Sequence, residues 1–302
     1  MFKRKLTTLS FEGNKIKCLT MQGNRIHAWG SEVVPSEQMN QGVIHDPQTV
    51  SKTLSQLLED TKASRRRVIT SVTDQRSIHR IMTLPDIKED LLEETILRKA
   101  KQEFPTPADE TDFAWKIVHR SGNQIALYVL AVPKIVIDRQ VETLRAANIK
   151  PKVMDAKPIA LMHAINKETC IILNLESYSM AVILVVNHLP AIVRTVPLEN
   201  NQLTKEAKLN LLSQELARTI KFYNESHKAN PLPDETPVFP TGEHFEFPRL
   251  EERLSNRPDL LNRLETSTPY PIETPDPPLP FPAELPIANY AVNIGLAIKG
   301  TR

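Results

Sequence analysis

The sequence contains few glycines, few cysteines and no long apolar run. Only eight of its 302 residues are glycine, and the two cysteines, Cys18 and Cys170, are too few for a disulfide framework. Both lie in apolar runs, so we expect buried free thiols. The longest apolar run, residues 180–186, is far too short to span a bilayer. The polar stretch after the basic start MFKRK does not fit a signal-peptide core, and we expect a cytoplasmic protein.

An excess of charge of one sign is also absent. Lysine and arginine number 38 against 36 aspartates and glutamates, and the formal net charge is +2. No global field therefore favours nucleic acid or an acidic membrane. The strongest basic run is residues 64–67. A phosphate or nucleic-acid site there would need aromatic residues or further basic clusters nearby. The sequence around the run has none, and we interpret it as a solvated helix end.

Motifs for metal binding and for hydrolysis are missing as well. The eight histidines form no HExxH motif, none is paired with cysteine at ligand spacing, and GxSxG and P-loop motifs are absent. Acidic residues begin the segment 86–101 and basic residues end it, which is typical of a charged helix face. A paired-carboxylate hydrolase site there is the weaker alternative. We predict no metal site and no catalytic residue.

Proline, in contrast, is frequent near the end of the chain. Of the 24 prolines, 14 lie between residues 231 and 286. Because proline lacks a backbone donor and fixes φ, this region should consist largely of extended connections. We interpret residues 269–286 as a connection wrapped on the body before the last helix. A polyproline ligand for a partner domain is the alternative.

The order of apolar patterns divides the chain into two similar halves. Each begins with three strands joined by short turns and followed by a helix, which predicts two α/β subdomains. Residues 1–168 are the first half, with an inserted lobe at about 74–150, and residues 169–302 are the second. Expected strands lie within 6–34 (three), 66–73, 76–85, 113–133 (a hairpin), 150–156, 170–198 (three) and at the start of 238–256. Expected helices lie at 46–61 with Asp46 as N-cap, 86–104, 134–149, the end of 150–166, 203–226, the end of 238–256, and 287–300 ending at Gly300.

The same three-residue sequence pattern recurs at the first turn of each half. Ser10-Phe11-Glu12 and Asn174-Leu175-Glu176 each place a short polar residue, an apolar residue and a glutamate there. The two copies lie 164 positions apart. Why a glutamate stands at both turns is the main question that the sequence raises.

The duplicated layout resembles the actin-like ATPase superfamily, which has a ribonuclease H-like fold. The inserted lobe makes the chain similar to the cell-division protein FtsA and to the type IV pilus assembly protein PilM. The resemblance to the PilM family extends over most of the chain. It includes GVIHDPQTVSKTLSQLLED, VITSVT, IHRIMTLPDIKEDLLEETILRKAKQEFPTPADETDFAWKIV, VETLRAANIKPKVMDAKPIALMHAI, LARTIKFYNES and the closing AVNIGLAIKG. An actin-like duplicated fold with a lobe in its first half is therefore expected.

The resemblance implies Mg-ATP bound between the halves by two Asp-x-Gly turns and a glycine-rich turn near the adenosine. Such glycines let backbone amides approach phosphate, and the aspartates bind the water shell of Mg²⁺. This sequence instead has Ser10 and Asn174 in the aspartate positions, Glu12 and Glu176 in the glycine positions, and Gly242 alone in the adenosine turn. Both glutamates would face the phosphates, so we expect no bound ATP. The alternative is that both are exposed turn residues.

The resemblance also implies a function. It indicates a cytoplasmic scaffold, peripheral at the inner face of the cell membrane, in the assembly platform of a type IV pilus or a related type II secretion system. Members of the family bind the cytoplasmic tail of a membrane-spanning PilN-like partner in a cleft by the lobe, here at residues 78–133. A working ATPase or sugar kinase of the same fold is the alternative. A nucleic-acid-binding module is disfavoured by the balanced charge, and the sequence leaves self-association open.

Overall fold

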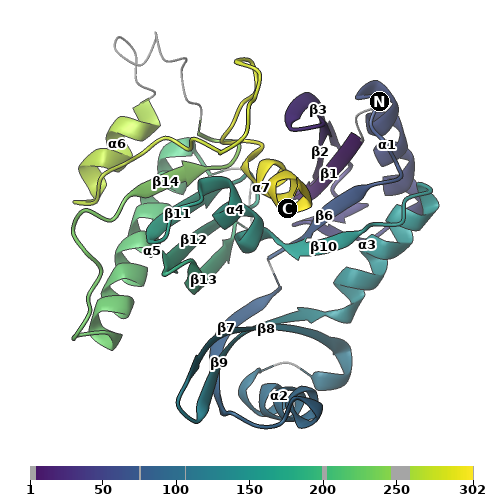
Figure 1. Cartoon of the computed structure of the whole chain (residues 1–302). Helices are drawn as coiled ribbons and strands as arrows, with labels where there is room; N and C mark the ends of the chain where they lie inside the picture. Colours follow the sequence, from purple (N-terminus) through teal and green to yellow (C-terminus); the bar gives the residue numbers. More distant parts are fainter. Residues whose placement is uncertain (1–4, 75, 106, 199–202, 246–258, 302) are drawn as a thin grey trace.

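Two β-sheets lie side by side with two helices between them, and a smaller lobe lies below (Figure 1). The computed structural model describes residues 5–74, 76–105, 107–198, 203–245 and 259–301. Each sheet begins with three antiparallel strands that are consecutive in the chain, and a helix comes after them in the chain. The predicted repeat of this unit is therefore confirmed, and the fold is actin-like, as expected.

The first sheet has the strand order β10-β6-β1-β2-β3. Strands β1, β2 and β3 form the antiparallel unit, while β6 and β10 run parallel to β1. The helices α1 and α3 cover the outer face, and the side chain of Asp46 caps α1 as predicted. The bounds are β1 Lys5–Glu12, β2 Lys15–Gln22, β3 Arg25–Val33, β4 Met39–Asn40, β5 Val43–Ile44, α1 Pro47–Asp60, β6 Val68–Val72, α3 Lys134–Ala146 and β10 Val153–Ala156.

The second sheet has the order β13-β12-β11-β14. Its first three strands are antiparallel, and β14 runs parallel to β11. The helices α5 and α6 pack on its outer face through an apolar core that includes Leu212 and Leu264. The bounds are β11 Cys170–Leu175, β12 Ser179–Val186, β13 Leu189–Pro197, α5 Lys205–Ser226, β14 Val238–Thr241 and α6 Asp259–Ser267.

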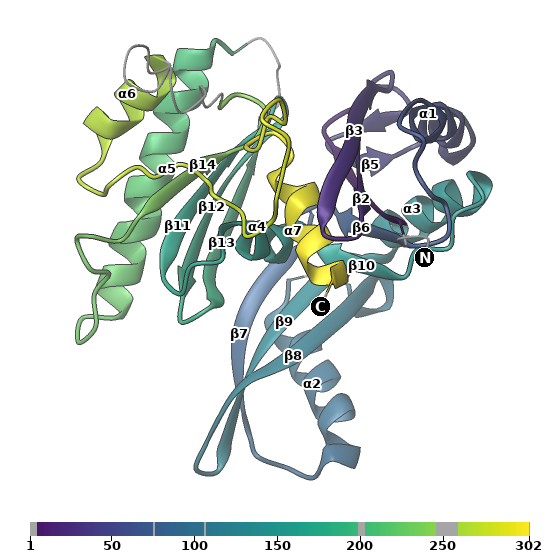
Figure 2. The ribbon, with the colours of Figure 1, turned by 45° about the horizontal axis from the view of Figure 1, so that its top comes forward.

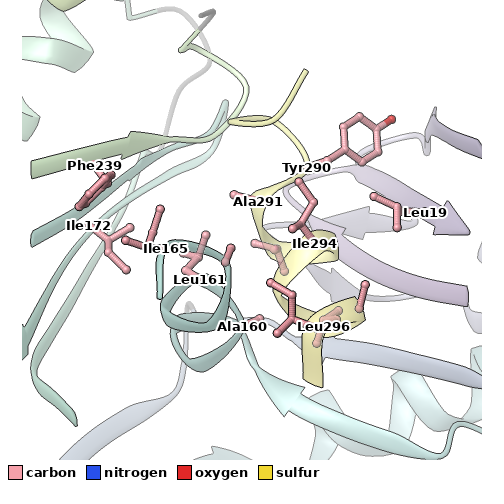
Figure 3. Packing of buried hydrophobic residues seen from close by; sticks show 14 of the residues in the cluster. Leu19, Ala160, Leu161, Ile165, Ile172, Phe239, Tyr290, Ala291, Ile294 and Leu296 are labelled. Carbon is pink, nitrogen blue, oxygen red and sulfur yellow. The ribbon is translucent and has the colours of Figure 1, made fainter. Parts of the chain in front are cut away.

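The helices α4 (Lys157–Ile165) and α7 (Ala291–Thr301) fill the space between the sheets. Figure 3 shows their side chains meeting Leu19 of the first sheet and Ile172 and Phe239 of the second. The two helices approach so closely that a Cβ on Gly295 would collide with the backbone carbonyl of Ala160. One apolar core therefore joins both sheets.

The lobe is a three-stranded antiparallel sheet covered by one helix. Its order is β7-β9-β8, so β7 and β8 are edge strands. The helix α2 packs on one face through Leu92, Ile96 and Ala100. Figure 2 shows the lobe below both sheets, on the side opposite to β3. The bounds are β7 Ile78–Pro85, α2 Glu89–Glu103, η1 Ala108–Glu110, β8 Thr111–Ser121 and β9 Gln124–Pro133.

Two expectations about the C-terminal helices need correction. The helix α6 was not predicted, and the short helix expected near 249–256 lies outside the described residues. The last helix does not end at Gly300 but continues to Thr301. A Cβ on Gly300 would lie 2.6 Å from Cδ2 of Leu6 and 2.7 Å from Cδ1 of Ile69. This glycine therefore lets α7 lie close to β1 and β6.

The proline-rich connection before α7 follows the body of the protein, as predicted. The backbone amide of Val238 donates to the carbonyl of Pro271 (2.8 Å), on the second sheet. Farther along, the carbonyl of Pro280 accepts from the amide of Ile26 (3.5 Å), on the first sheet. The connection thus crosses from one sheet to the other. Within the described residues, no helix is long and apolar enough to cross a membrane.

Candidate functional site

The turns that follow β1 and β11 meet between the two sheets. Glu12 ends β1 and is 6% exposed, and Glu176 follows β11 and is 3% exposed. The alternative that both glutamates are exposed turn residues is therefore wrong. The turns also touch directly, because a Cβ on Gly13 would lie 2.5 Å from Cδ2 of the Tyr178 ring.

Two buried lysines accompany the two glutamates. Lys17 of β2 donates from Nζ to Oε2 of Glu176 (3.2 Å) and to the carbonyl of Asn289 (3.0 Å). The Nζ of Lys157, at the start of α4, lies 3.1 Å from Oε2 of Glu12 and 3.9 Å from Oδ1 of Asp74. All the ionic side chains of this group are buried. The pair of Lys17 and Glu176 joins one sheet to the other.

Burial and mutual attraction set the charges of this group. Burial raises the pKa of Glu176 to about 8, and the neighbouring Glu12 carboxylate acts in the same direction, against Lys17 and Lys157. Burial would also raise the pKa of Glu12, but Lys157 and Lys17 outweigh it and hold the pKa at about 2. For Lys17, burial is outweighed by Glu12 and Glu176, and its pKa is raised. Burial and Glu12 thus favour the protonated form of Glu176, whereas the lysines favour the ionised form of Glu12.

The turn after β14 completes the site with a second ion pair between the sheets. Gly242 has φ +100°, and a Cβ there would collide with the backbone carbonyl of Leu175. Its amide donates to the carbonyl of Ala288 (2.9 Å). Glu243 forms an ion pair with Lys15 of β2, and its Oε1 accepts from the amide of Ser177 (2.6 Å). The glycine therefore serves close packing of backbone segments.

The two residues in the predicted aspartate positions bond to the protein itself. The hydroxyl of Ser10 donates to Oδ1 of Asn293 (3.0 Å), whose Nδ2 donates to the carbonyl of Thr8 (3.2 Å). Asn174 donates from Nδ2 to Oγ1 of Thr241 (3.2 Å) and to Oε1 of Glu176 (3.4 Å). Among the described residues, no group of three or more His, Cys, Asp or Glu side chains could hold a metal ion.

The structure thus brings all the predicted site residues to one region. Ser10, Glu12, Asn174, Glu176 and Gly242 lie where the two sheets and α7 meet. The sequence pattern did not identify the lysines as their partners. One signal was present, since Lys17 lies within the otherwise apolar strand IKCLTM.

A separate groove of about 800 Å³ lies between the lobe and the second sheet. Apolar side chains and charged side chains both line it, and one ion pair in its wall joins Lys299 to Asp155 (2.8 Å). The phenol of Tyr128 in its wall hydrogen-bonds Nδ1 of His79 (2.5 Å). The edge strands β8 and β13 both contribute to the groove. Its apolar lining includes Trp115, Leu130, Met154, Ile159, Met162 and Leu189, and its basic lining includes Lys116, Lys167 and Lys299.

Comparisons with known proteins give a family and related structures. A family model described as type IV pilus assembly protein PilM matches residues 14–203. No curated protein matches the chain. A solved PilM-PilN type IV pilus biogenesis complex contains a chain with a TM-score of 0.78 and 19% identity, covering 99% of each chain.

Two further solved structures are similar in fold. The ethanolamine utilization protein EutJ from Carboxydothermus hydrogenoformans has a TM-score of 0.55 and 8% identity, over 98% of this chain and 89% of that one. The cytoplasmic domain of EpsL, an inner membrane component of the type II secretion system of Vibrio cholerae, has a TM-score of 0.51 and 11% identity. That match covers 87% of this chain and 94% of the EpsL chain.

The substitution Lys17→Met tests the buried ion pair between the sheets. Because Glu12 and Glu176 would stay buried without this cation, we expect the free energy of unfolding to fall by about 3–5 kcal/mol. Denaturant-induced unfolding measures the change. Lys221→Met is the matched control, since its ion pair with Glu225 is exposed and should contribute much less. Equal losses in the two variants would contradict a stabilising buried network.

The raised pKa of Glu176 predicts a pH dependence of stability. Between its ordinary value of 4.5 and the folded value of about 8, the folded state holds a proton that the unfolded state releases. This contribution is complete below about pH 4.5 and is lost as the pH rises through about 8.

Glutamine cannot ionise. We therefore expect the variant Glu176→Gln not to show this loss of stability as the pH rises. The measurement is the free energy of unfolding of wild type and variant across that pH window, so that other titrating groups cancel in the difference. The exposed Glu37→Gln is the control and should follow wild type. Parallel curves for wild type and Glu176→Gln would refute the assignment.

Proposed function

The chain belongs to the family of the type IV pilus assembly protein PilM, and we propose that it acts as a cytoplasmic scaffold that binds a membrane partner without ATP turnover. The observation that carries this proposal is the buried ion-pair network between the two sheets. These side chains stand at the two turns that resemble the phosphate turns of the superfamily, so they would exclude the phosphates of ATP.

Binding a nucleotide would first require these side chains to separate. The Tyr178 ring lies against Gly13, and Lys17 contacts Glu176 across the interface. Removing one partner from a buried ion pair costs about 3–5 kcal/mol. The phosphate charges would then face the Glu12 carboxylate, and each like-charge contact costs on the order of 1 kcal/mol in water and several in a partly closed cleft.

The groups that would bind phosphate and Mg²⁺ are also engaged elsewhere. The amide of Ser177 donates to Glu243, and the amide of Gly242 donates to Ala288. Ser10 and Asn174 supply no carboxylate for a hard cation, which prefers charged oxygen ligands. One observation favours the ATPase alternative: Lys17 and Lys157 are cations beside the two turns that would face the phosphates. Lys157 is paired with Glu12 and Asp74, while Lys17 is hydrogen-bonded to Glu176 and attracted by Glu12.

The groove beside the lobe is the proposed site for the partner's tail. The solved complex similar to this chain pairs PilM with PilN, and we infer a PilN-like membrane protein as the partner here. The edge strand β8 and the edge strand β13 border the groove, so an extended peptide could pair with a free strand edge. Trp115, Leu130 and Met162 would receive its apolar side chains. The protein would then be peripheral at the inner face of the cell membrane.

Addition of Mg-ATP tests the absence of nucleotide binding. A ligand present at 100 times its dissociation constant stabilises the folded state by about 2.7 kcal/mol. We expect no upward shift of the melting temperature with millimolar Mg-ATP, compared with Mg²⁺ alone. A shift that EDTA abolishes would return the protein to the ATPase class.

The substitution Ala114→Arg tests the groove as the tail site. Ala114 is exposed on β8 and lines the groove, so an arginine there would obstruct it without altering a core contact. We expect a synthetic peptide of the partner's cytoplasmic tail to bind roughly tenfold or more weakly, a loss of about 1.4 kcal/mol or more. Calorimetry measures the affinity, and Ala229→Arg, at an exposed position outside the groove, is the matched control. Unchanged affinity in Ala114→Arg would place the tail elsewhere.

A further inference from the structure

Basic residues gather at the edge of the first sheet where β1, β6 and β10 begin. These three strands are parallel, with Thr7 opposite Val68 and Val153 opposite Ile69, so their starts lie at the same edge. The turn between β2 and β3 returns to this edge, because Gln22 lies opposite Lys5. Loops that are far apart in the sequence are therefore neighbours here.

We call this set of side chains the basic edge. The three loops that form it, 22–25, 61–67 and 148–152, contain no aspartate or glutamate. The acidic residues Glu59 and Asp60 lie near the end of α1, directly before the loop 61–67. The basic edge consists of Lys5, Arg25, Lys62, Arg65, Arg66, Arg67, Lys150 and Lys152.

Three members of the basic edge bond to the protein. Arg65 lies 3.5 Å from Oε1 of Glu59, Lys5 donates to the carbonyl of Lys62 (3.1 Å), and Arg67 donates to the carbonyl of Gly300 (2.6 Å). The other five are exposed and, within the described part of the chain, form no ion pair; they are Arg25, Lys62, Arg66, Lys150 and Lys152. Residues 64–67 follow the end of α1, and the fold brings further basic residues beside them that are distant in the sequence.

We propose that the basic edge binds anionic lipid headgroups of a membrane surface. Several lysines and arginines near a negative bilayer add their attractions, which act within about a Debye length, near 10 Å at 0.1 M salt. The overall charge of +2 does not oppose this, since distant charges are screened. Nucleic acid fits less well, because the three loops contain no aromatic side chain on which bases could stack.

The position of the basic edge supports a membrane rather than another partner. The last turn of α7 lies beside β10 (Figure 2) and contacts both the groove and the basic edge. Lys299 lines the groove, while the next residue, Gly300, accepts the hydrogen bond of Arg67. A membrane-anchored tail in the groove would hold this side of the protein near the bilayer. The inference goes beyond the proposed function, because lipid contact needs no partner.

Vesicle flotation with the full chain tests the proposal. We expect wild type to float with vesicles of phosphatidylglycerol and phosphatidylcholine at low salt, to be released by salt, and to ignore pure phosphatidylcholine. The variant Lys62→Gln/Arg66→Gln/Lys150→Gln/Lys152→Gln should bind roughly tenfold or more weakly. The matched control loses the same charge at exposed positions on α2 and around α5, by Lys101→Gln/Lys205→Gln/Lys221→Gln/Lys228→Gln, and should bind like wild type.

Three outcomes would overturn the proposal. The first is that wild type does not float with the vesicles at low salt. The second is that the two quadruple variants lose vesicle binding equally. The third is that the first variant loses binding to single-stranded DNA but keeps binding to vesicles. The same variants are titrated with the tail peptide of the partner. If the first variant loses vesicle binding but binds the peptide normally, the two proposals are independent. If the groove does not bind the peptide, vesicle binding by wild type should still be observed.

Discussion

The structure depends on a positive charge that is buried between its two sheets. The Lys17 ammonium is 1% exposed, and burying such an ion costs several kcal/mol unless other groups replace its water. Glu176 of the second sheet and the carbonyl of Asn289 make the direct contacts, and Glu12 adds its attraction. Lys157 neutralises Glu12 in turn. Because the partners come from separate parts of the chain, the charges are satisfied only when the two sheets are in this relative position.

Apolar packing supports the same relative position of the sheets. The helices α4 and α7 share a core with both sheets, and their backbones meet at Gly295 and Ala160 without room for a Cβ. The proline-rich connection crosses from Val238 to Ile26 on the outside. Interiors packed to this density have discrete arrangements and do not deform continuously. The interface between the two sheets is therefore a packed interior that also contains buried ion pairs.

Local pattern predicts most of the elements and only part of the site. Alternation and caps such as Asp46 locate the strands and α1, whereas α6 lies in a proline-rich region where extended chain was expected. The turns with Glu12 and Glu176 stand out because they are duplicated. Their lysine partners do not, since Lys17 and Glu176 are 159 positions apart and only the fold brings them together. The basic edge has the same cause, because strand order alone joins its three loops.

The C-terminal helix α7 belongs, by its packing, to the beginning of the chain. Asn293 donates to the carbonyl of Thr8, 285 positions earlier, and α7 covers Leu6, Leu19 and Ile69. The ribosome synthesises the strands of the first sheet long before it synthesises α7, the helix that covers them. Until α7 has been made, the inner face of the first sheet is therefore an exposed apolar surface, the kind of surface that makes nascent chains prone to aggregate and recruits chaperones. Contacts of such long sequence separation also form late in folding. The first half thus becomes a finished domain only when the last residues of the second half have emerged.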